Sequence, residues 1–123
     1  MNQIPNKPYN LEERTLEFSK RIVKMCKTLQ KDTVNFELMK QGLRSGTAVG
    51  ANYIEANDAL SKKDFVHRLR IARKEAKETV YWLKLIIEAN KNLETRIQPL
   101  VKEADEIKKI LSSIIDKSGI KLK

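Results

Sequence analysis

The chain has 123 residues, of which 41% are hydrophobic and 33% are charged. This size predicts one domain, residues 1–123, with a single core, and the composition is typical of helical proteins. Lys and Arg outnumber Asp and Glu by 25 to 16, giving a net charge of +9. This excess favours a polyanionic partner such as RNA or DNA, while a basic surface that only contacts solvent is the alternative.

Composition also argues against several classes of protein. No run of about 18 apolar residues is present, which excludes a membrane-spanning helix. The first residues lack the apolar centre of a signal peptide, so we do not expect secretion. Cys26 is the single cysteine and cannot form an internal disulfide. These features together predict a cytoplasmic protein.

The first helix is predicted over residues 11–31, after an irregular arm over residues 1–10 that contains two prolines. Asn10 and Glu13 form a capping-box pattern at its start. Its apolar residues recur at helical spacing and predict a buried stripe of Leu11, Phe18, Ile22, Met25, Cys26 and Leu29. Because Cys26 lies on this stripe, we expect a buried thiol rather than a reactive one.

The second helix is predicted over residues 36–59 and carries three glycines at a spacing of four, Gly42, Gly46 and Gly50. Each glycine destabilises a helix interior by roughly 1 kcal/mol relative to Ala, so the stripe predicts the close approach of a partner backbone. The segment from Gly46 to Gly50 also resembles a phosphate-binding loop. However, no strand precedes it and no Gly-Lys-Ser/Thr follows, so we favour helix packing.

Two more helices follow. The third is predicted to open at Ser61, with Asp64 as the partner in a weaker capping box, and to end at residues 90–92. Pro99 is best tolerated in a first turn, so the fourth helix is predicted to begin near Gln98. Gly119 favours its end, and residues 120–123 are expected to fray. Four amphipathic helices with short connections predict an all-α, antiparallel up-down-up-down four-helix bundle.

The sequence offers little catalytic chemistry. His67 is the only histidine, which with one cysteine is too few for a zinc site. Glutamates at positions 55, 75 and 78 could meet between helices, but the Glu-x-x-His pairs of di-metal bundles are absent. We therefore expect salt bridges there, no metal, no cofactor and no enzymatic activity.

The basic helix faces are stronger candidates for a functional site, as surfaces that bind nucleic acid. A stripe on the third helix can neutralise phosphates without reading bases, and its tyrosine can stack on a base. A second cluster lies toward the end of the first helix, where cations also favour the helix dipole. An ordinary solvated face is the alternative for both. The candidate nucleic-acid-binding residues are Lys63, His67, Arg70, Lys74, Lys77, Tyr81 and Lys84 on the third helix, and Lys20, Lys24 and Lys27, flanked by Arg21 and Lys31, on the first.

The two central helices carry a recognisable pattern, LRSGTAVGANYIEA over residues 43–56, SKKDF over 61–65, LRIARKEAKET over 69–79 and YWL over 81–83. It resembles the 23S ribosomal RNA intervening-sequence protein family, which has no established activity. The resemblance implies a four-helix bundle that assembles into a ring-like homopentamer. The family is also similar to accessory proteins of diversity-generating retroelements, which bind nucleic acid and a reverse transcriptase.

Five charged or polar residues match positions of this family pattern, and we expect them to form a polar network between the second and third helices. They are Arg44, Asn52, Glu55, Glu75 and Glu78. The sequence thus predicts a non-enzymatic, homo-oligomeric bundle, pentameric by resemblance, that binds RNA or DNA through a basic face. The alternative is an adaptor that docks an acidic protein such as a polymerase-like enzyme.

Overall fold

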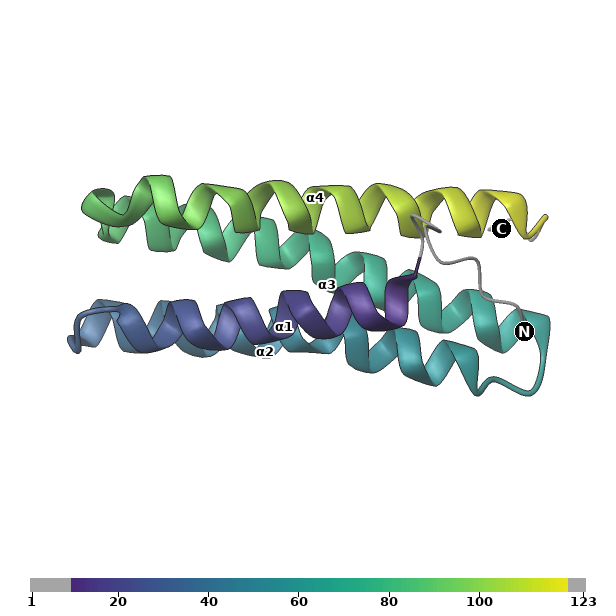
Figure 1. Ribbon diagram of the computed structural model, residues 1–123. Coiled ribbons are helices and arrows are strands. Elements are labelled where there is room, and N and C mark those ends of the chain that lie inside the picture. Colours follow the sequence, from purple (N-terminus) through teal and green to yellow (C-terminus); the bar gives the residue numbers. More distant parts are fainter. Residues whose placement is uncertain (1–9, 120–123) are drawn as a thin grey trace.

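A computed structural model describes residues 10–119 of the chain. Each of four helices runs antiparallel to the one before it, as Figure 1 shows, and together they form the expected all-α bundle. They are α1 (Leu11–Thr28), α2 (Thr33–Asn57), α3 (Lys62–Ala89) and α4 (Glu94–Lys117), with the short 3-10 helix η1 (Lys91–Leu93) before α4. Over residues 10–119, none of these helices is both long and apolar enough to cross a membrane.

Side-chain caps begin three of the helices. The Asn10 side chain accepts the backbone N–H of Glu13 and donates to its carboxylate, at 3.5 and 3.2 Å. Ser61 accepts the N–H of Asp64 at 3.0 Å, as its position in the sequence predicts. Asp32 accepts the N–H of Asn35 at 2.8 Å, which starts α2 earlier than predicted.

Several predicted helix ends were wrong. α1 ends at Thr28 rather than at residue 31, because the backbone of Leu29 is extended. α2 covers residues 33–57 rather than 36–59. The largest error concerns Pro99, which lies inside α4 rather than in its first turn. Proline removes one backbone donor, and its exposed position leaves the orphaned carbonyl accessible to water.

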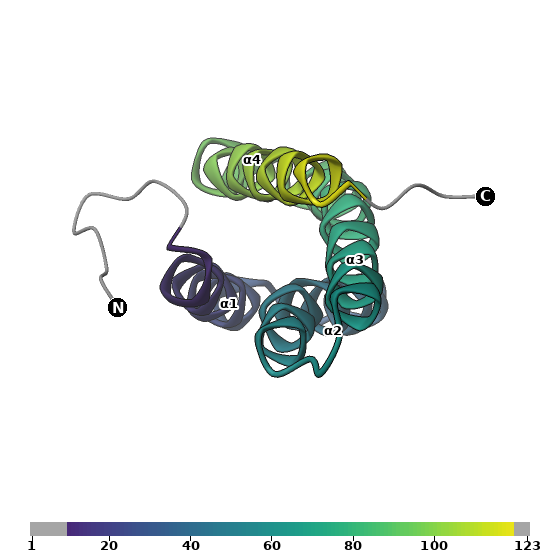
Figure 2. The ribbon, with the colours of Figure 1, turned by 90° about the vertical axis from the view of Figure 1, so that its right-hand side faces the viewer.

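The four helices follow one another around the bundle, so that α3 lies diagonally across from α1 (Figure 2). α2 packs most extensively on α3, and α3 packs on α4. The contact between α1 and α4 is the smallest of those between neighbouring helices, which leaves a seam along the bundle. A guanidinium crosses this seam, because Arg14 on α1 binds Glu103 and Glu106 on α4, each at 2.7 Å.

The core is formed by the apolar stripes of all four helices. The six residues predicted for the buried stripe of α1 and its end are at most 8% exposed. The largest fully buried side chains include Phe18, Leu69, Leu83 and Ile107. Amphipathic patterning therefore places the core correctly, because burial of apolar area dominates the packing of such helices.

Two buried side-chain amides lie at the end of the bundle where α2 begins and α3 ends. Asn35 at the start of α2 and Asn90 at the end of α3 exchange hydrogen bonds of 3.1 and 2.8 Å. Their amide groups also donate to the carbonyls of Gln30 and Ile86, each at 2.8 Å. The pair thus satisfies its own donors and ties the connection after α1 to the end of α3.

The three glycines of α2 lie on its buried face but approach two different helices. A β-carbon on Gly46 would lie 3.1 Å from Ile22 Cγ1, and one on Gly50 would lie 2.9 Å from Thr15 Oγ1, both on α1. A β-carbon on Gly42 would instead lie 3.3 Å from Ile86 Cδ1 on α3. The stripe therefore packs inside the bundle of one chain, against side chains rather than against a partner's backbone.

Candidate nucleic-acid interface

The outer face of α3 presents the predicted basic stripe to solvent. Arg70 is half-buried, and the other six stripe residues are exposed. Among residues 10–119, the ammonium groups of the four stripe lysines, Lys63, Lys74, Lys77 and Lys84, have no carboxylate within 4.0 Å. Their charge is consequently not neutralised by ion pairs within the described part of the chain, and it is available to phosphate groups.

An aromatic residue, Tyr81, lies among the lysines of this stripe on α3. Tyr81 is 58% exposed, and its ring packs edge-on against Trp82, with ring centroids 5.1 Å apart. Trp82 is half-buried, so it fixes one edge of the tyrosine while the remainder meets solvent. A rigid exposed ring between lysines has the properties of a stacking platform for a base.

A shallow hollow of about 570 Å³ extends from Tyr81 across to α2. Its lining includes Lys74 and Lys77, which the sequence singles out as candidates, and Gln41 and Trp82, which it does not. The missed residues come from the other helix and from the half-buried side of α3. Helical periodicity within α3 cannot show which residues of α2 lie beside it.

The polar network between α2 and α3 is smaller than predicted. Arg44 on α2 binds Glu75 and Glu78 on α3, at 3.3 and 3.0 Å. Asn52 does not take part, because its amide donates to the Ala48 carbonyl of its own helix at 2.9 Å. Glu55 is exposed and is not brought to this network either. Of these residues, Arg44 and Glu78 line the hollow, so the Glu78 carboxylate reduces its positive charge.

The cluster on α1 is also exposed but lies on a different side of the bundle. Lys20, Lys24 and Lys27 all face solvent, and Lys20 makes an exposed pair with Glu17 at 3.4 Å. Because α1 and α3 stand diagonally opposite, the two predicted basic clusters do not merge into one surface (Figure 2).

Chemistry beyond ion pairing is sparse over residues 10–119. In this part of the chain, no group of three or more His, Cys, Asp or Glu side chains is placed to hold a metal. His67 is exposed on α3. Burial raises the pKa of the Cys26 thiol to about 11, which keeps it protonated at neutral pH. The predicted reading of Cys26 as a small buried side chain fits this environment.

Comparisons with known proteins agree with the fold. No curated protein matches the chain. A crystal structure of a protein of unknown function from the S23 ribosomal protein family of Bacteroides thetaiotaomicron is 43% identical, with a TM-score of 0.76. The similarity covers 85% of this chain and 96% of that one.

A family profile, described as that of the 23S rRNA-intervening sequence protein, matches residues 9–113. This range contains all of α1, α2 and α3 and most of α4. It also contains every candidate residue on the two basic faces. The chain therefore belongs to the 23S rRNA-intervening sequence protein family.

Proposed function

We propose that this chain is a non-enzymatic, cytoplasmic protein that binds RNA or DNA through the basic face of α3. The observation that carries the proposal is the exposed Tyr81 ring among unpaired lysines. Lysines at a spacing of three or four residues follow one side of a helix and can track a phosphate backbone. Contact of this kind is electrostatic and independent of sequence, while stacking on Tyr81 adds affinity for unpaired bases.

A salt titration tests this proposal. Fluorescence anisotropy with a labelled single-stranded RNA should give micromolar or tighter binding at low salt. The logarithm of the binding constant should fall with the logarithm of salt concentration by about 0.7 for each phosphate contacted. Absence of binding to RNA and DNA at low salt would overturn the proposal.

Matched variants locate the surface. Lys74→Gln with Lys77→Gln should weaken binding and reduce the salt slope by roughly 1.4. Lys102→Gln with Lys117→Gln removes the same charge from exposed positions on α4 and should leave the slope nearly unchanged. Tyr81→Ala should lower affinity roughly 5- to 150-fold, corresponding to about 1–3 kcal/mol for a stacked base, whereas Tyr81→Phe should retain it. Equal effects of the two lysine pairs would mean that only net charge matters.

We also propose that the chain is a homo-oligomer, and a pentamer by the family resemblance. Five apolar side chains of α1 and α2 remain 36–53% exposed. They form what we call the α1–α2 apolar face: Leu16, Val23, Phe36, Leu43 and Ile54. A patch of this kind on a small chain favours burial against another copy. Light scattering should give about five times 14.2 kDa, and Leu43→Lys should lower that mass. A monomer at micromolar concentration would overturn this part of the proposal.

The adaptor alternative predicts a different ligand for the same basic surface. An acidic partner, for example a polymerase-like enzyme, would dock on the lysines and remain bound after nucleic acid is digested. A pull-down from nuclease-treated lysate therefore separates the two. A protein retained there, whose binding is lost in Lys74→Gln with Lys77→Gln, favours the adaptor.

A further inference from the structure

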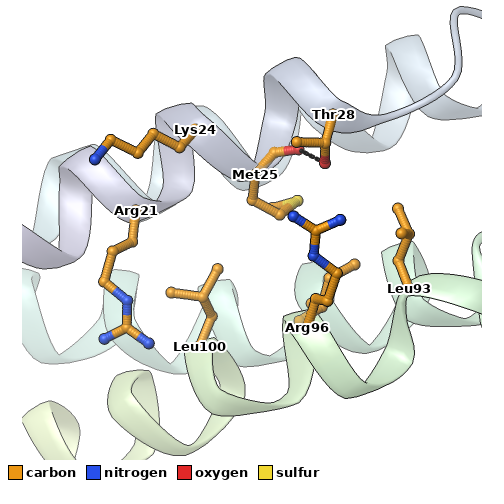
Figure 3. Close-up of a pocket in the computed structure, with 8 residues that line it drawn as sticks. Arg21, Lys24, Met25, Thr28, Leu93, Arg96 and Leu100 are labelled. Carbon is orange, nitrogen blue, oxygen red and sulfur yellow. Dashed lines mark hydrogen bonds between the residues drawn. The ribbon is translucent and has the colours of Figure 1, made fainter.

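A second cationic site lies in the seam between α1 and α4, at the end where α1 finishes and α4 begins. The structure has there a cavity of about 200 Å³ (Figure 3). The cavity is lined by residues of both helices. They include the apolar side chains of Met25, Ile97 and Leu100 and the cationic side chains of Arg21, Lys24 and Arg96.

The charges around this cavity are unbalanced. None of the residues that line it is acidic. Within residues 10–119, Arg21, Lys24 and Arg96 have no carboxylate within 4.0 Å. The charge of Arg21 also acts on Glu103, so the excess positive charge at the cavity comes mainly from Lys24 and Arg96. Like charges that line one cavity favour an anion between them. The cavity is therefore electrostatically suited to an anionic ligand.

The other end of the same seam shows the contrast. There Arg14 is held by Glu103 and Glu106, each at 2.7 Å, and the adjacent hollow is lined by Glu13 and Glu17 as well. Arg21 and Glu103 also line that hollow, so carboxylates outnumber cations there. Within residues 10–119, the end near Arg96 instead combines cationic and apolar side chains with no acidic residue in its lining.

The shape of the cavity narrows the class of ligand. In Figure 3, Arg21 extends from α1 toward α4 and Arg96 extends from α4 toward α1, with Leu100 between them. Planar guanidinium groups stack on flat aromatic rings, and the buried side chains below offer an apolar surface. A volume of about 200 Å³ is below the roughly 300–1,000 Å³ of pockets that enclose whole drug-sized ligands. The site thus suits one flat ring with a phosphate attached.

We propose that this cavity takes one unpaired base of a single-stranded nucleic acid, with the neighbouring phosphate on Arg21 and Lys24. The inference rests on the proposed function and deepens it, because it adds a site on α1 and α4 that α3 does not provide. Bases of a duplex are stacked and paired and cannot enter. The protein should consequently prefer single strands to duplexes of the same length, beyond the effect of charge.

The side chain of Met25 supplies a local reporter. In protein labelled with ¹³C at the methionine methyl groups, adenosine monophosphate or a short single-stranded RNA should shift the Met25 methyl resonance through the ring current of the bound base. Met39 on α2 does not line the cavity and is the internal control. Ribose 5-phosphate, which lacks the base, and a duplex of equal length should leave Met25 unshifted.

Two variants complete the test. Arg96→Ala changes an exposed side chain, so the fold should persist, and it should abolish the Met25 shift. Lys102→Ala removes an exposed charge of α4 outside the cavity and should preserve the shift. RNA that binds with strong salt dependence but leaves Met25 unmoved would overturn the inference while the proposed function stands.

The remaining outcomes are also decisive. An equal shift with ribose 5-phosphate would show a simple anion site and overturn the base pocket. A shift with a polyglutamate peptide but not with RNA would assign the cavity to an acidic protein segment instead. Absence of any RNA binding at low salt would overturn the proposed function itself.

Discussion

Replacing each glycine of α2 by alanine gives a graded test of how tightly the helices pack. Alanine favours a helix interior over glycine by about 1 kcal/mol, so an unhindered site would be stabilised by that amount. At Gly42 the new β-carbon meets only the tip of Ile86, at 3.3 Å, and a small shift of that flexible tip relieves the contact. We expect Gly42→Ala to stabilise the protein by up to about 1 kcal/mol.

Gly50 should behave in the opposite way. Its β-carbon would lie 2.9 Å from Oγ1 and 3.1 Å from Cβ of Thr15. The Thr15 hydroxyl donates to the Leu11 carbonyl at 2.6 Å, so its rotation breaks a buried hydrogen bond. Overpacking costs roughly 1–3 kcal/mol, so a net loss of up to about 2 kcal/mol remains after the gain of about 1 kcal/mol in helix propensity. Gly46→Ala, which meets buried Ile22 at 3.1 Å, should fall between the two.

Urea unfolding followed by circular dichroism, at one fixed protein concentration, measures this order. Thr15→Ala removes the hydroxyl, so Gly50→Ala should be less harmful in that background than in the native one. The reasoning is refuted if Gly50→Ala is as stable as the native protein, or if Gly42→Ala loses more than Gly50→Ala.

Three further predictions concern buried or half-buried polar groups. Asn90→Leu leaves the amide of Asn35 without its partner and should lower the free energy of unfolding in urea by about 1–3 kcal/mol, whereas no loss would contradict the buried pair. With a pKa of about 11, Cys26 should react with a thiol reagent at pH 8 more than about 100-fold slower in native than in unfolded protein, and equal rates would show an accessible thiol. Arg14 lowers the pKa of Glu103, so their pair stabilises the fold above the ordinary carboxyl pKa and loses this effect as pH falls through the lowered value. By thermal unfolding, Glu103→Gln should therefore cost roughly 1 kcal/mol at pH 7 and progressively less as the pH falls below the ordinary carboxyl pKa, and a cost that does not change with pH would contradict this.

The elements that could be predicted from sequence are those that depend on local signals. The capping pairs at Asn10 and Ser61 mark the starts of α1 and α3, and helical spacing identifies the core residues. Residues 32–35 fall between the predicted first and second helices, and Asp and Asn favour turns and caps. In the structure Asp32 caps α2, while Asn35 is buried by its pair with Asn90, a partner far along the chain that local patterns cannot show.

The candidate sites divide in the same way. The basic stripe of α3 is a property of one helix, so its spacing was enough to predict it. The α1–α4 cavity depends on Arg96, which no pattern singled out, because its significance comes only from facing Arg21 across the seam. The predicted polar network between α2 and α3 contained more residues than the observed one, because a family pattern does not show which partner each side chain has. Matching positions in a family pattern did not reveal that Asn52 binds its own helix and that Glu55 faces solvent.

Assembly through the α1–α2 apolar face would determine how these sites act together. No residue of that face lines the hollow at Tyr81 or the cavity at Arg96, so burial of the face does not itself remove a lining residue from either site. A strand long enough to reach two copies then binds the second at a high effective concentration, which raises its avidity without any new contact. A single nucleotide gains nothing from this arrangement. Affinity for long strands should therefore depend on assembly, whereas occupancy of one cavity should not.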